Sequence, residues 1–315
     1  MIEIENLTKR FGPFVAVDNL SFSVAAGQVL GFLGPNGAGK STTMRMLAGF
    51  LRPDSGRIRI FGDDLNERPL QVKSRLGYLP EGAPSYGDMP VRGFLQFIAQ
   101  ARGIERRQRS ARIAAIMARL QLETVANRSI ETLSKGFQRR VGLAQALIHD
   151  PSVLLLDEPT DGLDPNQKHE VRQLIRQLSD DKIVIISTHI LEEVEAVCQR
   201  AVIINHGRLV ADATPAQLKS SSDYFQAVEL ELDDAEGIAP ALRQLAGVRE
   251  VVVTPGQGNR VRVMAAKHAV IWPAVQAFLQ DRGIRPQSLS VSAGRLDDVF
   301  RRITVDQDPG REGEP

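Results

Sequence analysis

The stretch GPNGAGKS, from Gly34 to Ser41, decides the fold that we expect for this chain. It matches the pattern G-x-x-x-x-G-K-[ST], follows the strand-forming run QVLGFL, and precedes a predicted helix that begins near Lys40. A strand that turns sharply into a helix directs backbone N–H groups and the positive helix end toward one point, where anions bind. Glycines let the backbone approach phosphate oxygens closely. The sequence therefore predicts a phosphate-binding loop on an α/β sheet.

The side chains of this loop suit a nucleoside triphosphate with magnesium. Lys40 can bridge the β- and γ-phosphates, Ser41 can bind Mg²⁺, and Thr42 can offer a hydroxyl to the α-phosphate. The dinucleotide-binding pattern GxGxxG is not met, because Thr42 stands where its third glycine would be. A Gly-rich turn without a ligand is the structural alternative, and the strand and helix around the motif count against it. The nucleotide-binding set that we expect from the loop is Gly34, Pro35, Asn36, Gly37, Ala38, Gly39, Lys40, Ser41 and Thr42.

A second motif supplies carboxylates for the metal and for a water molecule. The sequence VLLLDEPT carries Asp157 and Glu158 directly after four apolar residues. In parallel sheets, ligands bind at the carboxyl ends of such buried strands. Asp157 can therefore hold Mg²⁺, and Glu158 can polarise an attacking water. A helix cap or a solvated turn is the alternative interpretation of two adjacent acids.

With four further motifs in the expected order, the chain resembles the nucleotide-binding subunits of ABC transporters over about residues 1–218. Phe11 stands where this family places an aromatic residue that stacks on adenine. The four motifs are the Q-loop-like YLPE (78–81), the signature-like LSKGFQRR (133–140), the D-loop-like DGLD (161–164) and STH (187–189), which ends in the switch histidine.

The resemblance implies ATP and Mg²⁺ as cofactors and a head-to-tail dimer of two nucleotide-binding domains, identical or different. Ser134, Lys135 and Gly136 of one copy would contact the γ-phosphate of ATP on the other copy. His189 would hold the γ-phosphate and orient Glu158 and the water. Hydrolysis would remove these γ-phosphate contacts, so the dimer would open.

The resemblance also assigns Asp164 to the dimer interface and Glu81 to the metal. Two positions depart from the usual signature LSGGQ, because Lys135 replaces the first glycine of the pair and Phe137 replaces glutamine. Glu81 replaces the usual Q-loop glutamine, and a carboxylate can bind Mg²⁺ but cannot donate an amide N–H. The implied Mg²⁺ ligands are Ser41, Asp157 and Glu81.

Three classes of protein use a phosphate loop of this kind: exporter ATPases, soluble ABC ATPases and P-loop kinases. The Q-loop region, the signature and the closing LDDVF are similar to ATP-binding subunits of gliding-motility and related type-two exporters. That similarity implies an ATPase at the cytoplasmic face of the membrane, peripheral to separate integral membrane subunits. The alternative is a soluble ABC ATPase acting on ribosomes or DNA, whose members usually have two nucleotide domains or long coiled coils. A P-loop kinase would need neither a signature nor a switch histidine. The transported substrate is not encoded in these motifs.

Composition agrees with a globular intracellular chain. The 315 residues are 43% hydrophobic and carry a net charge of +1, which argues against a nucleic-acid partner. Cys198, the single cysteine, excludes an intrachain disulfide. No apolar run approaches the ~20 residues of a membrane span, and the first residues lack the apolar core of a signal peptide.

The strand and helix periods predict two domains. Residues 1–218 form an α/β P-loop NTPase domain, by resemblance an ABC ATPase, with an inserted helical subdomain at about 90–150. After a linker, KSSSD at 219–223, residues 219–305 form a small α+β accessory or regulatory domain. Its βαββαβ order, with a turn at PGQGN (255–259), is typical of ferredoxin-like domains. The polar tail at 306–315 is predicted to be disordered.

Overall fold

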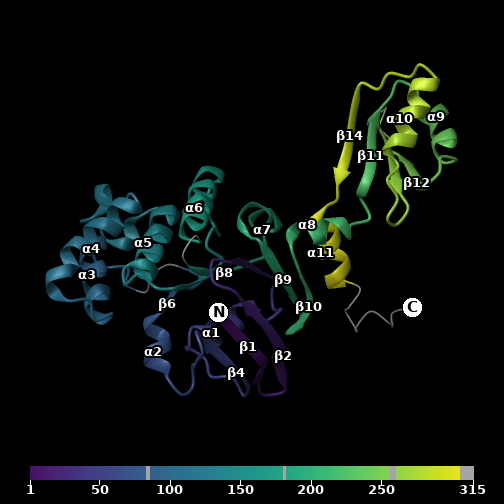
Figure 1. The fold of residues 1–315 in the computed structure, drawn as a ribbon. Helices are drawn as coiled ribbons and strands as arrows, with labels where there is room; N and C mark the ends of the chain where they lie inside the picture. Colours follow the sequence, from purple (N-terminus) through teal and green to yellow (C-terminus); the bar gives the residue numbers. More distant parts are fainter. Residues whose placement is uncertain (83–85, 180–181, 255–259, 306–315) are drawn as a thin grey trace. The chain divides into compact units, whose positions relative to one another are not determined.

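The computed structural model describes residues 1–82, 86–179, 182–254 and 260–305. The chain forms two compact units, Met1–Ala213 and Thr214–Pro315, and each is described by itself (Figure 1). The expected turn at 255–259 and the expected tail at 306–315 lie outside the described residues. No helix in the described ranges combines the length and the apolar character that a membrane span needs.

The first unit is built on a six-stranded sheet with the strand order β10-β9-β3-β8-β7-β6. All neighbouring pairs are parallel except β9 with β10. Every residue of β3, β7 and β8 is buried, as continuous apolar runs predict for strands covered on both faces. The strands are β3 (Val29–Leu33), β6 (Leu76–Leu79), β7 (Val153–Asp157), β8 (Ile183–Thr188), β9 (Arg200–Asn205) and β10 (Arg208–Ala213).

A second, antiparallel sheet packs on the same hydrophobic core. Its order is β2-β1-β4-β5, and the helix α1 contributes Met44, Met46 and Leu47 to the buried cluster that both sheets share. These elements are β1 (Ile2–Phe11), β2 (Phe14–Val24), β4 (Ser55–Ile60), β5 (Asp63–Asp64) and α1 (Lys40–Leu47).

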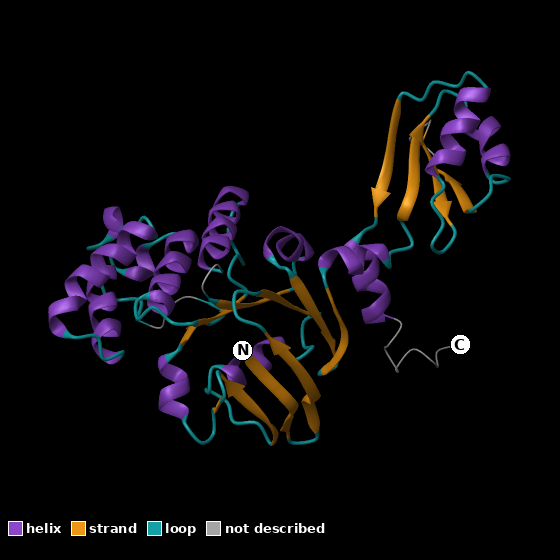
Figure 2. Ribbon diagram, in the orientation of Figure 1, coloured by secondary structure: helices purple, strands orange, loops and turns teal. Residues whose placement is uncertain are grey.

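Helices, which are all drawn in purple in Figure 2, complete the first unit and include the expected helical subdomain. The subdomain contains α3 (Val91–Ala101), α4 (Arg106–Arg119), two short 3₁₀ turns and α5 (Lys135–Leu147). The α/β P-loop fold with an inserted helical subdomain is thus confirmed. The remaining helices are α2 (Pro69–Ser74), α6 (Pro165–Leu178) and α7 (Leu191–Val197).

Cys198 follows α7 directly and is buried behind β3. Its Sγ lies 3.0 Å from the position that a Cβ on Gly31 would occupy, so the glycine leaves room for the sulfur. Burial raises the pKa of the Cys198 thiol to about 12.

The second unit contains a four-stranded antiparallel sheet in the order β12-β13-β11-β14. The helices α9 and α10 pack on one side of it around their own hydrophobic core (Figure 2). The strand and helix order is βαββαβ, and the ferredoxin-like assignment stays a prediction. The elements are β11 (Phe225–Glu231), α9 (Ala235–Leu242), β12 (Val248–Val253), β13 (Arg260–Ala265), α10 (Trp272–Asp281) and β14 (Ser288–Ala293).

The helix α8 (Pro215–Ser220), which spans the expected boundary between residues 218 and 219, belongs to the second unit, where it packs against α11 (Leu296–Val305). Thr214 begins α8 with a capping box. The expected linker is therefore partly helical, and its next residues are fixed: Asp298 accepts hydrogen bonds from the Ser222 hydroxyl and the Asp223 N–H.

Candidate nucleotide-binding site

The phosphate-binding loop joins β3 to α1 in the conformation that its glycines allow. Gly37 and Gly39 have φ of +81° and +100°, in the region that L side chains rarely adopt. A Cβ on Gly39 would also lie 2.4 Å from the Ala16 carbonyl oxygen. Within the loop, the Lys40 ammonium donates to the carbonyl oxygens of Gly34 at 2.8 Å and Pro35 at 3.2 Å.

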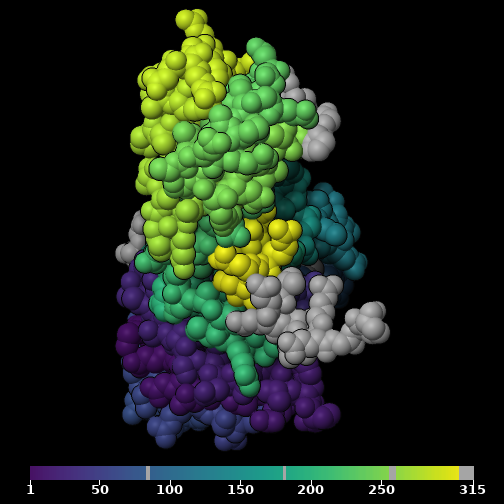
Figure 3. Space-filling view, turned by 90° about the vertical axis from the view of Figure 1, so that its right-hand side faces the viewer, coloured from purple at the N-terminus to yellow at the C-terminus, as the bar shows by residue number. Residues whose placement is uncertain are grey.

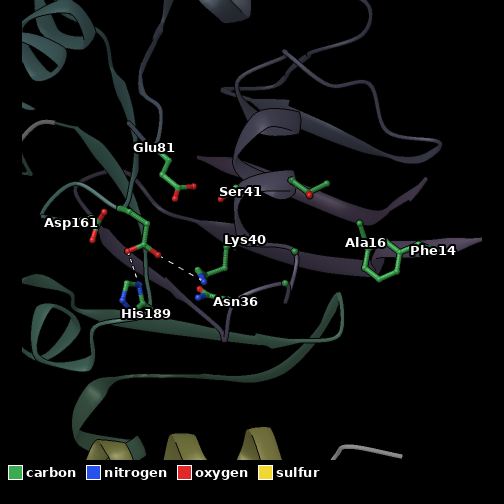
Figure 4. A pocket seen from close by; sticks show the side chains of 12 residues that line it. Phe14, Ala16, Asn36, Lys40, Ser41, Glu81, Asp161 and His189 are labelled. Atoms are coloured by element: carbon green, nitrogen blue, oxygen red, sulfur yellow. Dashed lines mark hydrogen bonds and ion pairs between the residues drawn. The ribbon is translucent and has the colours of Figure 1, made fainter. Parts of the chain in front are cut away.

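The loop opens into a pocket of about 540 Å³ at the carboxyl ends of β3, β6, β7 and β8. The close view in Figure 4 shows Lys40, Glu81 and His189 arriving from three different segments of the chain. The predicted residues that line this pocket are Asn36, Gly37, Gly39, Lys40, Ser41, Thr42, Glu81, Glu158 and His189. The other predicted residues lie outside its lining.

Asp157 lies beneath the pocket, in contact with Ser41. Its side chain ends β7, and the residue is 1% exposed. Asp157 Oδ1 is 3.4 Å from Ser41 Oγ and accepts a short hydrogen bond from the Ser187 hydroxyl of β8. Asp157 Oδ2 is buried with no hydrogen-bond partner among the described residues. A buried carboxylate oxygen that lacks a partner, beside a hydroxyl, is a donor set that fits a hard cation such as Mg²⁺.

Glu158 is held between a lysine and a histidine. Its φ of +48° is unusual for a non-glycine residue, and its N–H donates to the Ser187 carbonyl oxygen at 3.0 Å. Glu158 Oε2 lies 3.0 Å from His189 Nδ1, and Oε1 lies 3.9 Å from Lys40 Nζ (Figure 4). Burial lowers the pKa of the Lys40 ammonium, and the carboxylates of Glu158 and Asp157 oppose this effect. The Glu158 carboxylate is therefore fixed at the pocket wall, aimed between the loop and the end of β8.

Arg139 was not expected to take part, yet it fixes the segment that carries Glu81. It extends from α5, is 6% exposed, and donates to the carbonyl oxygens of Pro80 at 3.2 Å and Gly82 at 3.1 Å. These two residues flank Glu81. Burial lowers the pKa of the Arg139 guanidinium, and the carboxylates of Asp161 and Glu81 partly offset this. Asp161, which also lines the pocket, is a second residue that the sequence analysis did not assign to the site.

The aromatic residue that lines the pocket is Phe14, whereas Phe11, the residue expected to stack on adenine, lies outside the lining. The two residues face each other as the last pair of the β1–β2 hairpin. Phe14 lines the pocket beside Ala16, whereas the Phe11 ring lies near Lys9, with 5.6 Å from Lys9 Nζ to the ring centroid. Phe14 is therefore the aromatic side chain on this wall, and the contact of Phe11 with adenine stays a prediction.

The signature residues and Asp164 of the D-loop lie outside this pocket within one chain. Ser134 caps α5 by accepting from the Phe137 N–H, and Asp164 caps α6 by accepting from the Gln167 N–H at 3.0 Å. A Cβ on Gly136 would overlap the Gln167 side chain at 2.6 Å, so α5 and α6 begin in close contact there. These residues are therefore at helix starts, where N–H groups point outward.

Comparison with known proteins places these features in one family. The family model described as "ABC transporter" matches residues 17–161. A Nod factor export ATP-binding protein I of Cupriavidus metallidurans is 36% identical over 305 residues, which cover 96% of this chain and 97% of that protein. A linearmycin resistance ATP-binding protein of Bacillus subtilis is 32% identical over 306 residues, covering 96% and 98%. The solved structure of an ATP-binding subunit of an ABC transporter has a TM-score of 0.64 and 27% identity, and the match covers 70% of this chain and 92% of that one.

Proposed function

The chain belongs to the family of ABC transporter ATP-binding proteins and is an ATPase of that family; we propose that it drives an exporter by hydrolysing ATP between two head-to-tail copies. The observation that carries this proposal is the meeting of the phosphate loop, the Ser41–Asp157 pair and the Glu158–His189 pair at one edge of the sheet. The names of the relatives, Nod factor export and linearmycin resistance, support export over the soluble alternative on ribosomes or DNA.

ATP would bind with its phosphates on the loop. The N–H groups at the start of α1 would contact phosphate oxygens, and Lys40 would exchange the carbonyl oxygens of Gly34 and Pro35 for the β- and γ-phosphates. A phosphate oxygen carries charge and is a stronger acceptor for an ammonium than a carbonyl oxygen. Phe14 would offer its ring to adenine.

Magnesium fits the corner formed by Ser41 and Asp157, with Glu81 nearby on the pocket wall. When bound, the ion would neutralise charge on the β- and γ-phosphates. Ser187 keeps Asp157 in place by its hydrogen bond to Oδ1, which leaves Oδ2 available.

Glu158 would take a proton from the attacking water. Its carboxylate is oriented by His189 and lies close to the loop that would hold the γ-phosphate. His189, which is half exposed, can turn toward the γ-phosphate while it keeps Glu158 in place.

The signature residues would act on the second copy. Ser134, Lys135 and Gly136 stand at the start of α5, where N–H groups favour an anion, and Lys135 adds a positive charge. Asp164, which caps α6 next to them, would order the interface between the two copies. Losing the γ-phosphate would remove these contacts and open the dimer.

Separate integral membrane subunits would transmit this movement, with the chain at the cytoplasmic face of the membrane. A cluster of aromatic rings in the helical subdomain is suited to dock such a partner. Tyr86 and Phe97, both exposed, have ring centroids 5.4 Å apart, and Tyr86 also covers the buried Phe94. Exposed aromatic residues are enriched at protein interfaces.

The test compares Glu158→Gln with Lys40→Ala. Glu158→Gln keeps size but cannot take a proton, so hydrolysis should fall by about 10²–10⁴-fold. ATP binding should survive, and gel filtration with ATP and Mg²⁺ should show a dimer that is absent without ATP. Lys40→Ala, the control, should neither hydrolyse ATP nor dimerise. A Glu158→Gln chain that hydrolyses ATP normally or stays monomeric contradicts the assignment. Co-purification of a polytopic membrane protein from detergent-solubilised membranes tests the export partner.

A further inference from the structure

The second unit contains a pocket of about 580 Å³ that no nucleotide motif reaches, similar in volume to the nucleotide pocket of about 540 Å³. Its walls come from the end of α8, the start of β11, the loop between β13 and α10, and single residues of β12 and α11. The surface of α11 is yellow in Figure 3. We infer that this pocket binds the phosphoryl group of an anionic ligand.

The charges that line the pocket favour an anion. The lining contains three cationic side chains, Arg249, Lys267 and Arg302, and one carboxylate, Asp223. Asp298 lies close to this group, but its Oδ2 already accepts from the Ser222 hydroxyl at 2.9 Å and from the Asp223 N–H at 3.0 Å. His268, also on the wall, adds a further nitrogen that can donate.

The two arginines retain donors for a ligand. Asp223 Oδ1 is 3.4 Å from Nη1 of Arg249 and 3.4 Å from Nη1 of Arg302, longer than the 2.7–2.9 Å typical of charge-assisted hydrogen bonds. Both arginine side chains are about 40% exposed. A phosphoryl group offers several charged oxygens to such forks and would bind more strongly than this single shared oxygen.

The walls of the pocket are held together by contacts to backbone carbonyl oxygens. Arg302 Nη2 donates to the Ser221 carbonyl oxygen at 2.7 Å, which joins α11 to the end of α8. A Cβ on Gly294 would lie 2.1 Å from the Lys219 carbonyl oxygen, so this contact requires glycine. On the opposite wall, the Ala266 N–H donates to the Gly247 carbonyl oxygen at 2.7 Å. The cationic groups are thus carried by segments that are held together before a ligand arrives.

The lining also has an apolar part, beside three serines, which indicates that the ligand has an organic part. Phe225, Ala265 and Ala269 contribute carbon surface beside the cationic groups. Phosphorylated small molecules and phospholipid head groups share this chemistry, a phosphoryl group on a carbon skeleton. The experiment separates these two sources.

The experiment uses the full chain with Lys40→Ala, which disables the phosphate loop and leaves the second unit unchanged. Equilibrium dialysis with labelled pyrophosphate, at constant ionic strength set with chloride, measures binding directly. Trp272, the single tryptophan, begins α10 three residues after Ala269 and reports by its fluorescence where binding occurs. Saturable binding that changes this fluorescence is expected.

Matched variants assign the site. Arg249→Gln and Lys267→Gln should each weaken pyrophosphate binding by about 10-fold or more, because each removes a charged donor. Arg282→Gln makes the same charge change in the same unit, on a side chain that stacks on Phe278 outside the pocket, and should change nothing. Arg302 is left intact because it also holds the Ser221 carbonyl.

A second arm tests lipids by sedimentation with vesicles of phosphatidylcholine alone or with added phosphatidic acid. Binding to phosphatidic acid that Arg249→Gln abolishes identifies a lipid source, and pyrophosphate binding without it identifies a soluble one. Absence of both, or binding that is equally strong in Arg249→Gln, Lys267→Gln and Arg282→Gln, overturns the proposal.

Discussion

Ser41 Oγ lies 3.4 Å from Asp157 Oδ1, although 116 positions separate the two residues in the sequence. They meet because β3 and β7 are both neighbours of β8 in the sheet and run parallel to it. The loop after β3 and the carboxylate that ends β7 therefore reach the same edge. The predicted Mg²⁺ site depends on this short distance between the Ser41 hydroxyl and the Asp157 carboxylate.

Asp157→Asn should abolish most Mg²⁺-dependent hydrolysis, because it removes the charge that faces the cation. Ser187→Ala removes the hydrogen bond that orients Asp157, together with a longer one of 3.4 Å from the Glu158 N–H, and should weaken Mg²⁺ affinity by about 10- to 100-fold. ATPase rates measured over a range of Mg²⁺ concentrations check both. If Ser187→Ala shows the wild-type Mg²⁺ dependence, Asp157 is held by other contacts.

Phe14→Ala should weaken ATP binding more than Phe11→Ala does. Stacking of a base on an aromatic ring is worth roughly 1–3 kcal/mol, which corresponds to about ten- to hundredfold in affinity. The two substitutions remove the same ring from opposite strands of one hairpin, so each is the control for the other. Fluorescent-nucleotide titration measures the two affinities. A larger loss for Phe11→Ala would return the adenine contact to Phe11.

Arg139→Gln should lower the maximal rate and raise the Mg²⁺ concentration that hydrolysis requires. The guanidinium bonds the carbonyls on both sides of Glu81, and hydrogen bonds from charged donors contribute about 1.5–3 kcal/mol each. Arg139→Lys keeps the positive charge but not the planar guanidinium, so its maximal rate should fall less than that of Arg139→Gln. Kinetics are paired with urea denaturation to identify variants that do not fold. A folded Arg139→Gln chain with wild-type Mg²⁺ dependence would show that Arg139 does not position Glu81.

The free energy of unfolding should fall as the pH drops from about 6.5 toward 4, because of His149. Its Nε2 bonds the Leu76 carbonyl oxygen at 2.9 Å, and Nδ1 is buried with no hydrogen-bond partner among the described residues. Burial, and after it the charge of Arg102, lowers the pKa of His149 to about 4. The unfolded chain therefore binds this proton first as the pH falls, and stability present above pH 6.5 is lost. Urea denaturation midpoints of the wild-type chain and of His149→Gln, measured across this pH range, check the prediction. The midpoint of His149→Gln should depend less steeply on pH. Equal dependence in the two chains would exclude His149 as the cause.

The sequence predicts the part of the site that depends on local motifs at strand ends. Residues of the phosphate loop, Glu158 and His189 line one pocket because they follow buried apolar strands, and parallel strands bring their carboxyl ends to one edge of the sheet. Arg139 and Asp161 were missed because their roles depend on contacts between distant segments. Phe11 and Phe14 form one cross-strand pair, so spacing alone does not show which of them lines the pocket.

Tertiary packing also decides two features of the fold that local composition does not show. The strand β2 is fixed by its buried residues Val17, Leu20, Phe22 and Val24, which pack on the shared core. The serines at 220–222 resemble a flexible linker in composition, but the capping box at Thr214 and the contact with α11 give α8 a place in the second unit. Composition describes local preference, and tertiary packing overrides it here.

The burial of Cys198 makes the wild-type chain a ready background for site-specific labelling. The Cys198 thiol is buried behind β3 and has a pKa of about 12. It therefore forms almost no thiolate at neutral pH, and maleimide reagents should leave it unmodified. A cysteine introduced at Ser110, on an exposed position of α4, would then be the one thiol that reacts. Dyes attached there could follow the approach of two copies in real time, without first removing the natural cysteine.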